Sequence, residues 1–132
     1  MKKIIGLTPL LLIFLSCDPT SQMEANIENL TSQNLSVVFV SSDFSLGKTF
    51  QIAPGQIVPF QEGYDVGSTF LKPSLMEYDS VIIKNQVNET IKVYKRNDSS
   101  KNIYNVDEYW MVSEPSKRFF VYEFEIKTED IE

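Results

Sequence analysis

One stretch, Arg118-Phe-Phe-Val-Tyr-Glu-Phe-Glu-Ile-Lys127, decides the fold class of this chain. Its apolar side chains recur at every second position: Phe120, Tyr122, Phe124 and Ile126. Glu123 and Glu125 stand between them, so one side of the stretch is apolar and the other is charged. This period of two is typical of a β-strand that packs one face against a core. We therefore predict a strand over residues 118–127.

Two upstream segments, 80–84 and 90–95, show the same alternation on either side of the turn-rich residues 85–89. Their apolar positions Val81, Ile83, Ile91 and Val93 are expected to form matching inward faces. Two such segments joined by a short polar connection are typical of a β-hairpin. We predict a hairpin over 80–95.

Nearer the N-terminus, segments 26–30 and 35–41 flank the turn-rich residues 31–34, and we predict that they form a first hairpin. From Val37 onward the second segment is apolar at consecutive positions. A strand that is apolar on both faces is buried on both faces. We therefore expect a central position for 35–41.

A proline-glycine turn at 53–56 separates segments 47–52 and 57–60. Pro54 sets φ near −65°, and Gly55 accepts a positive φ without steric cost, so this turn is specified by its residue types. We expect the two segments to be the arms of one hairpin. Pro59 in the second arm cannot donate a backbone hydrogen bond, which favours an edge strand.

Three further segments complete the secondary-structure prediction. Residues 62–67 contain two glycines and are expected to form a loop, and 69–71 is expected to be a short strand before Pro73. Residues 106–112 are compatible with either a helical turn or a strand.

The pattern as a whole predicts an all-β domain. About seven short strands at spacings near ten residues indicate a single small β-sandwich of immunoglobulin-like type, or a partly open barrel. No segment has the apolar period of a long amphipathic helix. We expect one domain over residues 25–132.

The N-terminal segment has the anatomy of an export signal. Met1-Lys2-Lys3 precedes a short apolar run that ends at Leu15, and Ser16 stands before Cys17, the single cysteine of the chain. The run is shorter than the roughly 20 residues that a membrane-spanning helix needs, so a cleaved signal peptide over 1–16 is expected. An alternative is an ordinary secreted protein that is cut near Ser16 and keeps an odd free thiol.

We favour lipidation of Cys17, with residues 17–24 forming the lipidated cysteine and a polar tether. Acyl chains on Cys17 would attach the protein to a membrane of the cell envelope, the outer membrane in a Gram-negative cell, with the domain periplasmic or exposed at the surface. No disulfide is expected, because no second cysteine is present.

Charge narrows the range of partners. The formal net charge is −6 at pH 7, and removal of Lys2 and Lys3 with the leader would bring it to about −8. No basic cluster occurs, which argues against nucleic acid as a partner and leaves membrane attachment to the acyl chains.

Residue types also exclude several chemistries. The chain has no histidine, which removes the usual general base, the histidine-dependent triads and most zinc or copper sites. No phosphate-binding glycine loop is present, and we expect no cofactor and no enzymatic activity. The pairs Glu62 with Asp65, and Asp107 with Glu108, are the carboxylates that a small hydrolase would use. Calcium binding is the other use of such carboxylates, but the acidic residues do not match a calcium-loop pattern.

Candidate partner-binding residues come from loops and aromatic clusters. Residues 42–46 and 62–68 are the expected contact loops, and the second contains Glu62, Tyr64 and Asp65. Tyr109 and Trp110 are adjacent aromatics that either form a platform for a sugar or a protein partner or belong to the core.

Three parts of the sequence carry a resemblance: the Phe14–Cys17 ending, the turn Ile52-Ala-Pro-Gly-Gln56, and the closing segment Tyr122-Glu-Phe-Glu-Ile-Lys-Thr-Glu-Asp-Ile131. In these the chain resembles small cell-envelope lipoproteins of Bacteroidota to which no function is assigned. The resemblance implies an anchored envelope protein, and it transfers no catalytic residue to this chain.

We therefore expect a non-enzymatic, lipid-anchored envelope protein that binds a protein or glycan partner. One alternative is an immunity protein or inhibitor whose acidic surface occludes a basic toxin or enzyme. A second alternative is a small carboxylate-dependent hydrolase.

Overall fold

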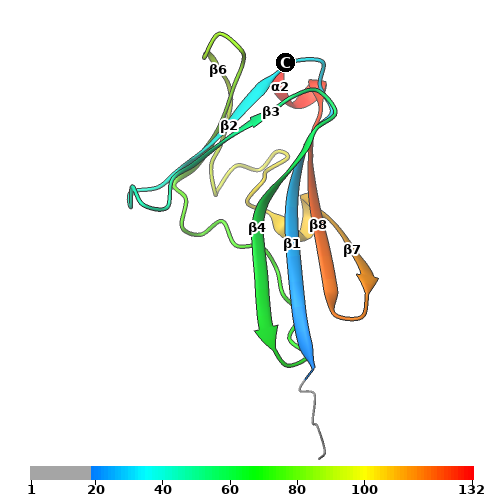
Figure 1. Ribbon diagram of the computed structural model, residues 1–132. Coiled ribbons are helices and arrows are strands. Elements are labelled where there is room, and N and C mark those ends of the chain that lie inside the picture. Colours follow the sequence, from blue (N-terminus) through cyan, green and yellow to red (C-terminus); the bar gives the residue numbers. More distant parts are fainter. Residues whose placement is uncertain (1–18) are drawn as a thin grey trace, which may run out of the picture.

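The structure, a computed structural model, describes residues 19–132, so the predicted signal peptide and Cys17 lie outside the described residues. These residues form eight strands and two single-turn helices (Figure 1). The elements in chain order are β1 (Thr20–Asn29), β2 (Leu35–Val40), β3 (Lys48–Ile52), β4 (Ile57–Val66), β5 (Ser80–Lys84), β6 (Thr90–Tyr94), α1 (Val106–Tyr109), β7 (Met111–Ser116), β8 (Phe119–Ile126) and α2 (Thr128–Ile131). Within residues 19–132, no helix has the length and apolar character needed to cross a membrane.

One sheet, here called the β1 sheet, has the strand order β4-β1-β8-β7. Its two central strands, β1 and β8, run parallel although they come from the two ends of the chain (Figure 1). The predicted alternation of β8 is confirmed, because its even-numbered residues are buried and its odd-numbered residues are half-buried. The strand predicted most directly from sequence is thus central to this sheet.

The second sheet, here called the β2 sheet, is antiparallel and has the order β3-β2-β5-β6. The predicted hairpin over 80–95 is confirmed as β5 and β6, with Asn88 in the left-handed region at φ 65° in the turn. The expected inward position of Val93 is wrong: the buried Val81 lies opposite Tyr94, which enters the core, whereas Val93 lies opposite Ile82 and is 36% exposed. The central position expected for 35–41 is also confirmed, since β2 lies between β3 and β5.

The core lies between the two sheets. The rings of Phe39 from β2 and Phe60 from β4 stack with centroids 4.5 Å apart. Across the other half of the interface, Tyr94 from β6 meets Phe124 from β8 edge to face at 5.9 Å. Two four-stranded sheets that bury their facing side chains in this way form a small β-sandwich, and no closed barrel is present in residues 19–132.

The first predicted hairpin is wrong in its pairing. Strands β1 and β2 follow one another, but β1 pairs with β4 and β8, whereas β2 pairs with β3 and β5. Residues 30–34 therefore form an arch that crosses from one sheet to the other. Asn29 holds this arch: its side-chain Nδ2 donates to the carbonyls of Gln33 and Ile52, and its Oδ1 accepts from the backbone N–H and the hydroxyl of Thr31.

The second predicted hairpin is wrong for the same reason. The turn at 53–56 exists, with Gly55 at φ 75° and the N–H of Gln56 bonded to the carbonyl of Ala53. Its two arms belong to different sheets, because β3 pairs with β2 and β4 pairs with β1. The expected edge position of Pro59 is confirmed, since β4 is the outer strand of the β1 sheet.

The pairing of β1 with β4 shows that two predictions are wrong: residues 20–24 are not a tether, and most of residues 62–67 are not a loop. β1 begins at Thr20, and its first residues pair with the last residues of β4, from Thr20 opposite Val66 to Glu24 opposite Glu62. The segment is polar, but Ser21 and Met23 face inward and are buried. The backbone pairing with β4 on one side and β8 on the other makes a strand of residues whose composition is typical of a linker.

Two predicted segments remain, residues 69–71 and residues 106–112. Residues 69–71 are not a strand; the connection between β4 and β5 instead packs on the inner side of the β1 sheet, where Phe70 meets Phe120 at 4.6 Å. In Figure 1 this connection crosses the part of the β1 sheet that extends below the β2 sheet. Residues 106–112 contain both expected structures, the helical turn α1 and then the start of β7.

Candidate functional site

The outer face of the β1 sheet gathers five glutamates. Register places Glu24 of β1 directly opposite Glu62 of β4, and Glu28 of β1 directly opposite Glu125 of β8. Glu123, two residues before Glu125, points to the same side of β8. We call this surface the acidic face; its members are Glu24, Glu28, Glu62, Glu123 and Glu125.

No member of the acidic face forms an ion pair among the described residues. The two ion pairs within residues 19–132 are Lys72–Asp107 and Lys101–Asp130, each at 2.7 Å. Lys101 and Lys127 line a hollow together with Glu123 and Glu125, so two cations lie near that end of the face, and Lys101 donates to the backbone carbonyl of Glu125. Like charges directly opposite on neighbouring strands destabilise a sheet, by about 0.2–1 kcal/mol a pair. The opposed glutamates therefore make the sheet less stable than neutral side chains at the same positions would.

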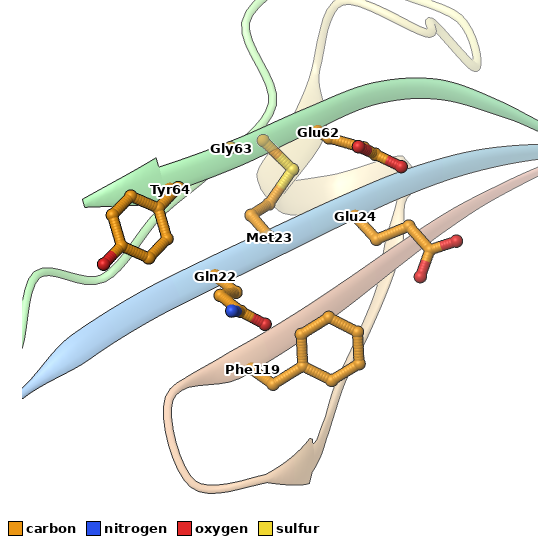
Figure 2. A pocket seen from close by; sticks show the side chains of 7 residues that line it. All are labelled: Gln22, Met23, Glu24, Glu62, Gly63, Tyr64 and Phe119. Carbon is orange, nitrogen blue, oxygen red and sulfur yellow. The ribbon is translucent and has the colours of Figure 1, made fainter.

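A hollow of about 430 Å³ opens on the same outer face, near the start of β1 (Figure 2). Its lining residues are Gln22, Met23, Glu24, Glu62, Gly63, Tyr64 and Phe119. Register aligns Tyr64, Gln22 and Phe119 in one row across β4, β1 and β8. Figure 2 shows the Gln22 side chain between the two rings, with the side chains of Glu24 and Glu62 farther along the strands. An amide flanked by two aromatic rings and next to two carboxylates can bind cationic and hydroxyl-bearing groups.

Two of the five candidate residues lie together in this hollow. Glu62 and Tyr64 both come from the end of β4 and point outward. Asp65 follows Tyr64 on the same strand and pairs with the inward-facing Ser21, so it lies on the opposite side of the sheet. The expected hydrolase pair of Glu62 with Asp65 is therefore wrong, because residues three apart on a strand face opposite ways.

Trp110 is not a binding platform. It is 5% exposed, its indole N–H donates to the carbonyl of Ile103 at 2.7 Å, and its ring packs against Phe60 and Phe124. The core alternative for this residue is correct, because a domain without disulfides buries its largest ring for stability. Tyr109 is half-buried beside a smaller hollow of about 260 Å³ that also contains Glu123 and Glu125.

In the second expected carboxylate pair, Asp107 and Glu108, each side chain interacts with a different residue. Asp107 binds Lys72, and the Glu108 carboxylate accepts from the side chain of Asn105, the residue that caps α1. Within residues 19–132, no group of three or more acidic, histidine or cysteine side chains is arranged to hold a metal ion.

The loop expected at 42–46 is found between β2 and β3, and it presents Phe44 with 96% of its surface exposed. Asp43 shapes the loop by accepting from the hydroxyl and the backbone N–H of Ser45. These hydrogen bonds lower the pKa of the Asp43 carboxyl. The loop belongs to the β2 sheet and adds nothing to the hollow.

Sequence reasoning missed Gln22, Glu24 and Phe119. The first two fell in the expected tether, and Phe119 was treated only as part of a strand. A signal was present, because Gln22, Glu24, Asn26 and Glu28 alternate with Met23, Ala25 and Ile27. That alternation over 22–28 is the pattern of a half-buried strand with a polar outer face.

The chain matches no protein-family model, no curated protein and no solved structure.

Proposed function

We propose that this protein is a non-enzymatic, lipid-anchored envelope protein that binds a partner on the outer face of its β1 sheet. The observation that carries the proposal is the acidic face, whose glutamates form no ion pair among residues 19–132, together with the aromatic row of the hollow. Rigid strands position both, so a partner meets a preformed surface and little ordering is required on binding.

The chemistry of the surface favours a basic protein as the partner. Opposed carboxylates that repel each other in the free protein gain a favourable interaction when a lysine- or arginine-rich surface covers them. Tyr64 and Phe119 suit such a partner as well, because a guanidinium group stacks on aromatic rings. A glycan partner would use the same rings through its apolar ring faces and the Gln22 amide through its hydroxyl groups.

Attachment to the membrane is part of the proposal. Cys17 is the acceptor of the acyl chains, and each buried CH₂ contributes about 0.8 kcal/mol, so two or more chains hold the protein firmly. The partner is accordingly a molecule of the cell envelope.

An inhibitor or immunity protein is the second candidate, and the acidic face is the observation that favours it. If the basic partner is a toxin or an enzyme, coverage of its cationic surface would block access to its substrate. A hydrolase is less well supported, because Glu24 and Glu62 lie on an open sheet face and hydrolysis of a glycan needs carboxylates on the two sides of a cleft.

The test is photo-cross-linking in cells with the full chain, a C-terminal tag and Cys17 intact. A photoreactive residue at Gln22, in the hollow, is compared with one at Thr49, which is exposed on β3 of the other sheet. We expect a specific protein adduct at position 22 and none at position 49.

Charge then separates the partner classes. Glu24→Gln with Glu62→Gln is expected to abolish the adduct, whereas Glu77→Gln with Glu89→Gln, which removes the same charge from exposed residues elsewhere, is expected to preserve it. Equal adducts at positions 22 and 49 would contradict the proposal. If no protein adduct forms but purified protein binds envelope glycans in a Tyr64-dependent manner, the partner is a glycan.

A further inference from the structure

We infer that the end of the β1 sheet at which β1 begins lies against the membrane surface, and that a very short tether holds it there. We call this end the β1 tip; its exposed or partly exposed residues include Thr20, Tyr64, Asp65, Val66, Lys117 and Arg118. The inference rests on the proposed acylation of Cys17, but it does not depend on which partner the protein binds.

The length of the tether carries the inference. Thr20, the first residue of β1, is the third residue after Cys17. A fully extended chain advances at most about 3.6 Å per residue, so the start of β1 stays within about 11 Å of Cys17. This reach is comparable with the thickness of one headgroup layer. The β1 tip therefore cannot leave the membrane surface while the acyl chains remain inserted.

Unpairing the start of β1 would lengthen the tether, but it would break several hydrogen bonds. The backbone N–H of Gln22 donates to the carbonyl of Arg118 at 2.8 Å, and the hydroxyl of the fully buried Ser21 donates to the carbonyl of Gly67 at 3.0 Å. The side chain of Arg118 also donates to the carbonyl of Thr20 at 3.3 Å. Even Pro19 is held, because its carbonyl accepts from the backbone N–H of Gly67.

The side chains of the β1 tip suit a lipid surface. Tyr64 is 64% exposed and Val66 is 58% exposed, so apolar surface faces outward at this end. Lys117 and Arg118 form the turn between β7 and β8 at the same end, in a protein that is acidic overall. Aromatic and cationic side chains are favoured at the headgroup level, where ring and alkyl parts meet lipid and charges meet phosphate.

The orientation has a consequence for the proposed site. The hollow includes Tyr64 and thus lies within the membrane-facing half of the molecule. β1 has ten residues and rises about 3.3 Å per residue, so its far end lies roughly 30 Å from the tip. A partner in the hollow must therefore itself lie at the membrane surface. The β5–β6 turn lies at the opposite end of the molecule in Figure 1.

The test measures the depth of two labelled positions in the acylated full-length product. Acylation blocks the thiol of Cys17, so an introduced cysteine is the single reactive thiol. Val66→Cys at the β1 tip and Val87→Cys in the β5–β6 turn, which is 72% exposed, each carry a fluorophore in purified protein reconstituted in liposomes of zwitterionic and anionic phospholipid. The quencher is attached to the lipid headgroup.

We expect quenching at position 66 to exceed quenching at position 87 at least threefold. Insertion of fifteen glycine and serine residues between Asp18 and Pro19 is expected to make the two positions nearly equal. Equal quenching without the insertion, or a difference that the insertion does not change, would overturn the inference. An intact-mass measurement that shows no acyl chains on Cys17 would also overturn the inference, because acylation of Cys17 is its premise. None of these readouts needs the partner, so a failed cross-link in cells and a failed orientation are distinguishable.

Discussion

At the scale of single residues, Asn29 forms hydrogen bonds with three segments: the 30–34 arch, the end of β3 and the turn at 53–56. Its amide makes four hydrogen bonds, two donated and two accepted, to residues of the 30–34 arch and the end of β3. Its own backbone N–H and carbonyl bond to the turn at 53–56. The side chain is completely buried, and three of its four bonds are buried from water, the exception being the bond to the carbonyl of Gln33.

Asn29→Ala is expected to lower the free energy of unfolding by about 3 kcal/mol, because it leaves buried backbone carbonyls and N–H groups without partners. The measurement is urea denaturation of residues 17–132 produced without acyl chains. Asn34→Ala, in the exposed part of the same arch, is the matched control and should cost less than about 0.5 kcal/mol. Similar losses for both variants would show that Asn29 does not hold the arch.

Tyr94 is the opposite case, since its hydroxyl is buried and no group within residues 19–132 forms a hydrogen bond with it. Burial, with a smaller contribution from Asp130, raises the pKa of this hydroxyl above its usual value near 10. Tyr94→Phe is therefore expected to leave the unfolding free energy at pH 8 unchanged or to raise it by up to about 1 kcal/mol. Tyr122→Phe, which loses the bond to the carbonyl of Leu71, should cost about 1 kcal/mol.

The raised pKa also predicts a pH dependence. Below pH 10 Tyr94 is neutral in both the folded and the unfolded chain, and its contribution is constant. Above pH 10 the unfolded chain loses this proton while the folded chain keeps it, so stability falls as pH rises toward the folded-state pKa. The decline measured above pH 10 should be shallower in Tyr94→Phe than in the wild type. An equal slope would contradict the assignment.

At the scale of elements, one like-charge pair lies across β1 and β4, where Glu24 is opposite Glu62. Glu24→Gln is expected to raise the unfolding free energy by a few tenths of a kcal/mol at low salt, since it removes repulsion and keeps the shape of the side chain. The gain should shrink at 1 M salt, because screening weakens the repulsion. Glu77→Gln, on an exposed loop, should show no comparable gain, and a destabilised Glu24→Gln would contradict the proposed repulsion.

Element by element, local pattern predicted strands well and their pairing less well. The β5–β6 hairpin was found because its turn and both arms belong to one sheet. The two arches have the same local signature, two alternating segments joined by a tight turn, yet their arms enter different sheets. Whether such a turn closes a hairpin or an arch depends on contacts with strands far along the chain, which a local pattern does not contain.

At the scale of the whole molecule, the proposed anchor sets where and how the domain acts. Cys17→Ala is expected to move the protein from the membrane fraction to the soluble fraction, because no other part of the proposed attachment supplies comparable burial of CH₂ groups. Fractionation with intact-mass measurement checks this. The variant Glu24→Gln with Glu62→Gln, with Cys17 intact, should remain in the membrane fraction. A Cys17→Ala protein that stays with membranes would contradict the anchor.

The sequence by itself determined the all-β class, because period-two alternation in 80–84 and 119–126 reports directly which faces meet water. It also determined which catalytic residue types the chain lacks, since histidine is absent throughout. Only the tertiary structure decided that residues 20–24 are a strand, that Trp110 is core, and that Glu24 and Glu62 share one surface. The first and third outcomes depend on the pairing of β1 with β4, whose residues are about forty positions apart, and the second depends on packing of Trp110 against Phe60 and Phe124. The free energy of such contacts comes from the completed sandwich rather than from any local segment.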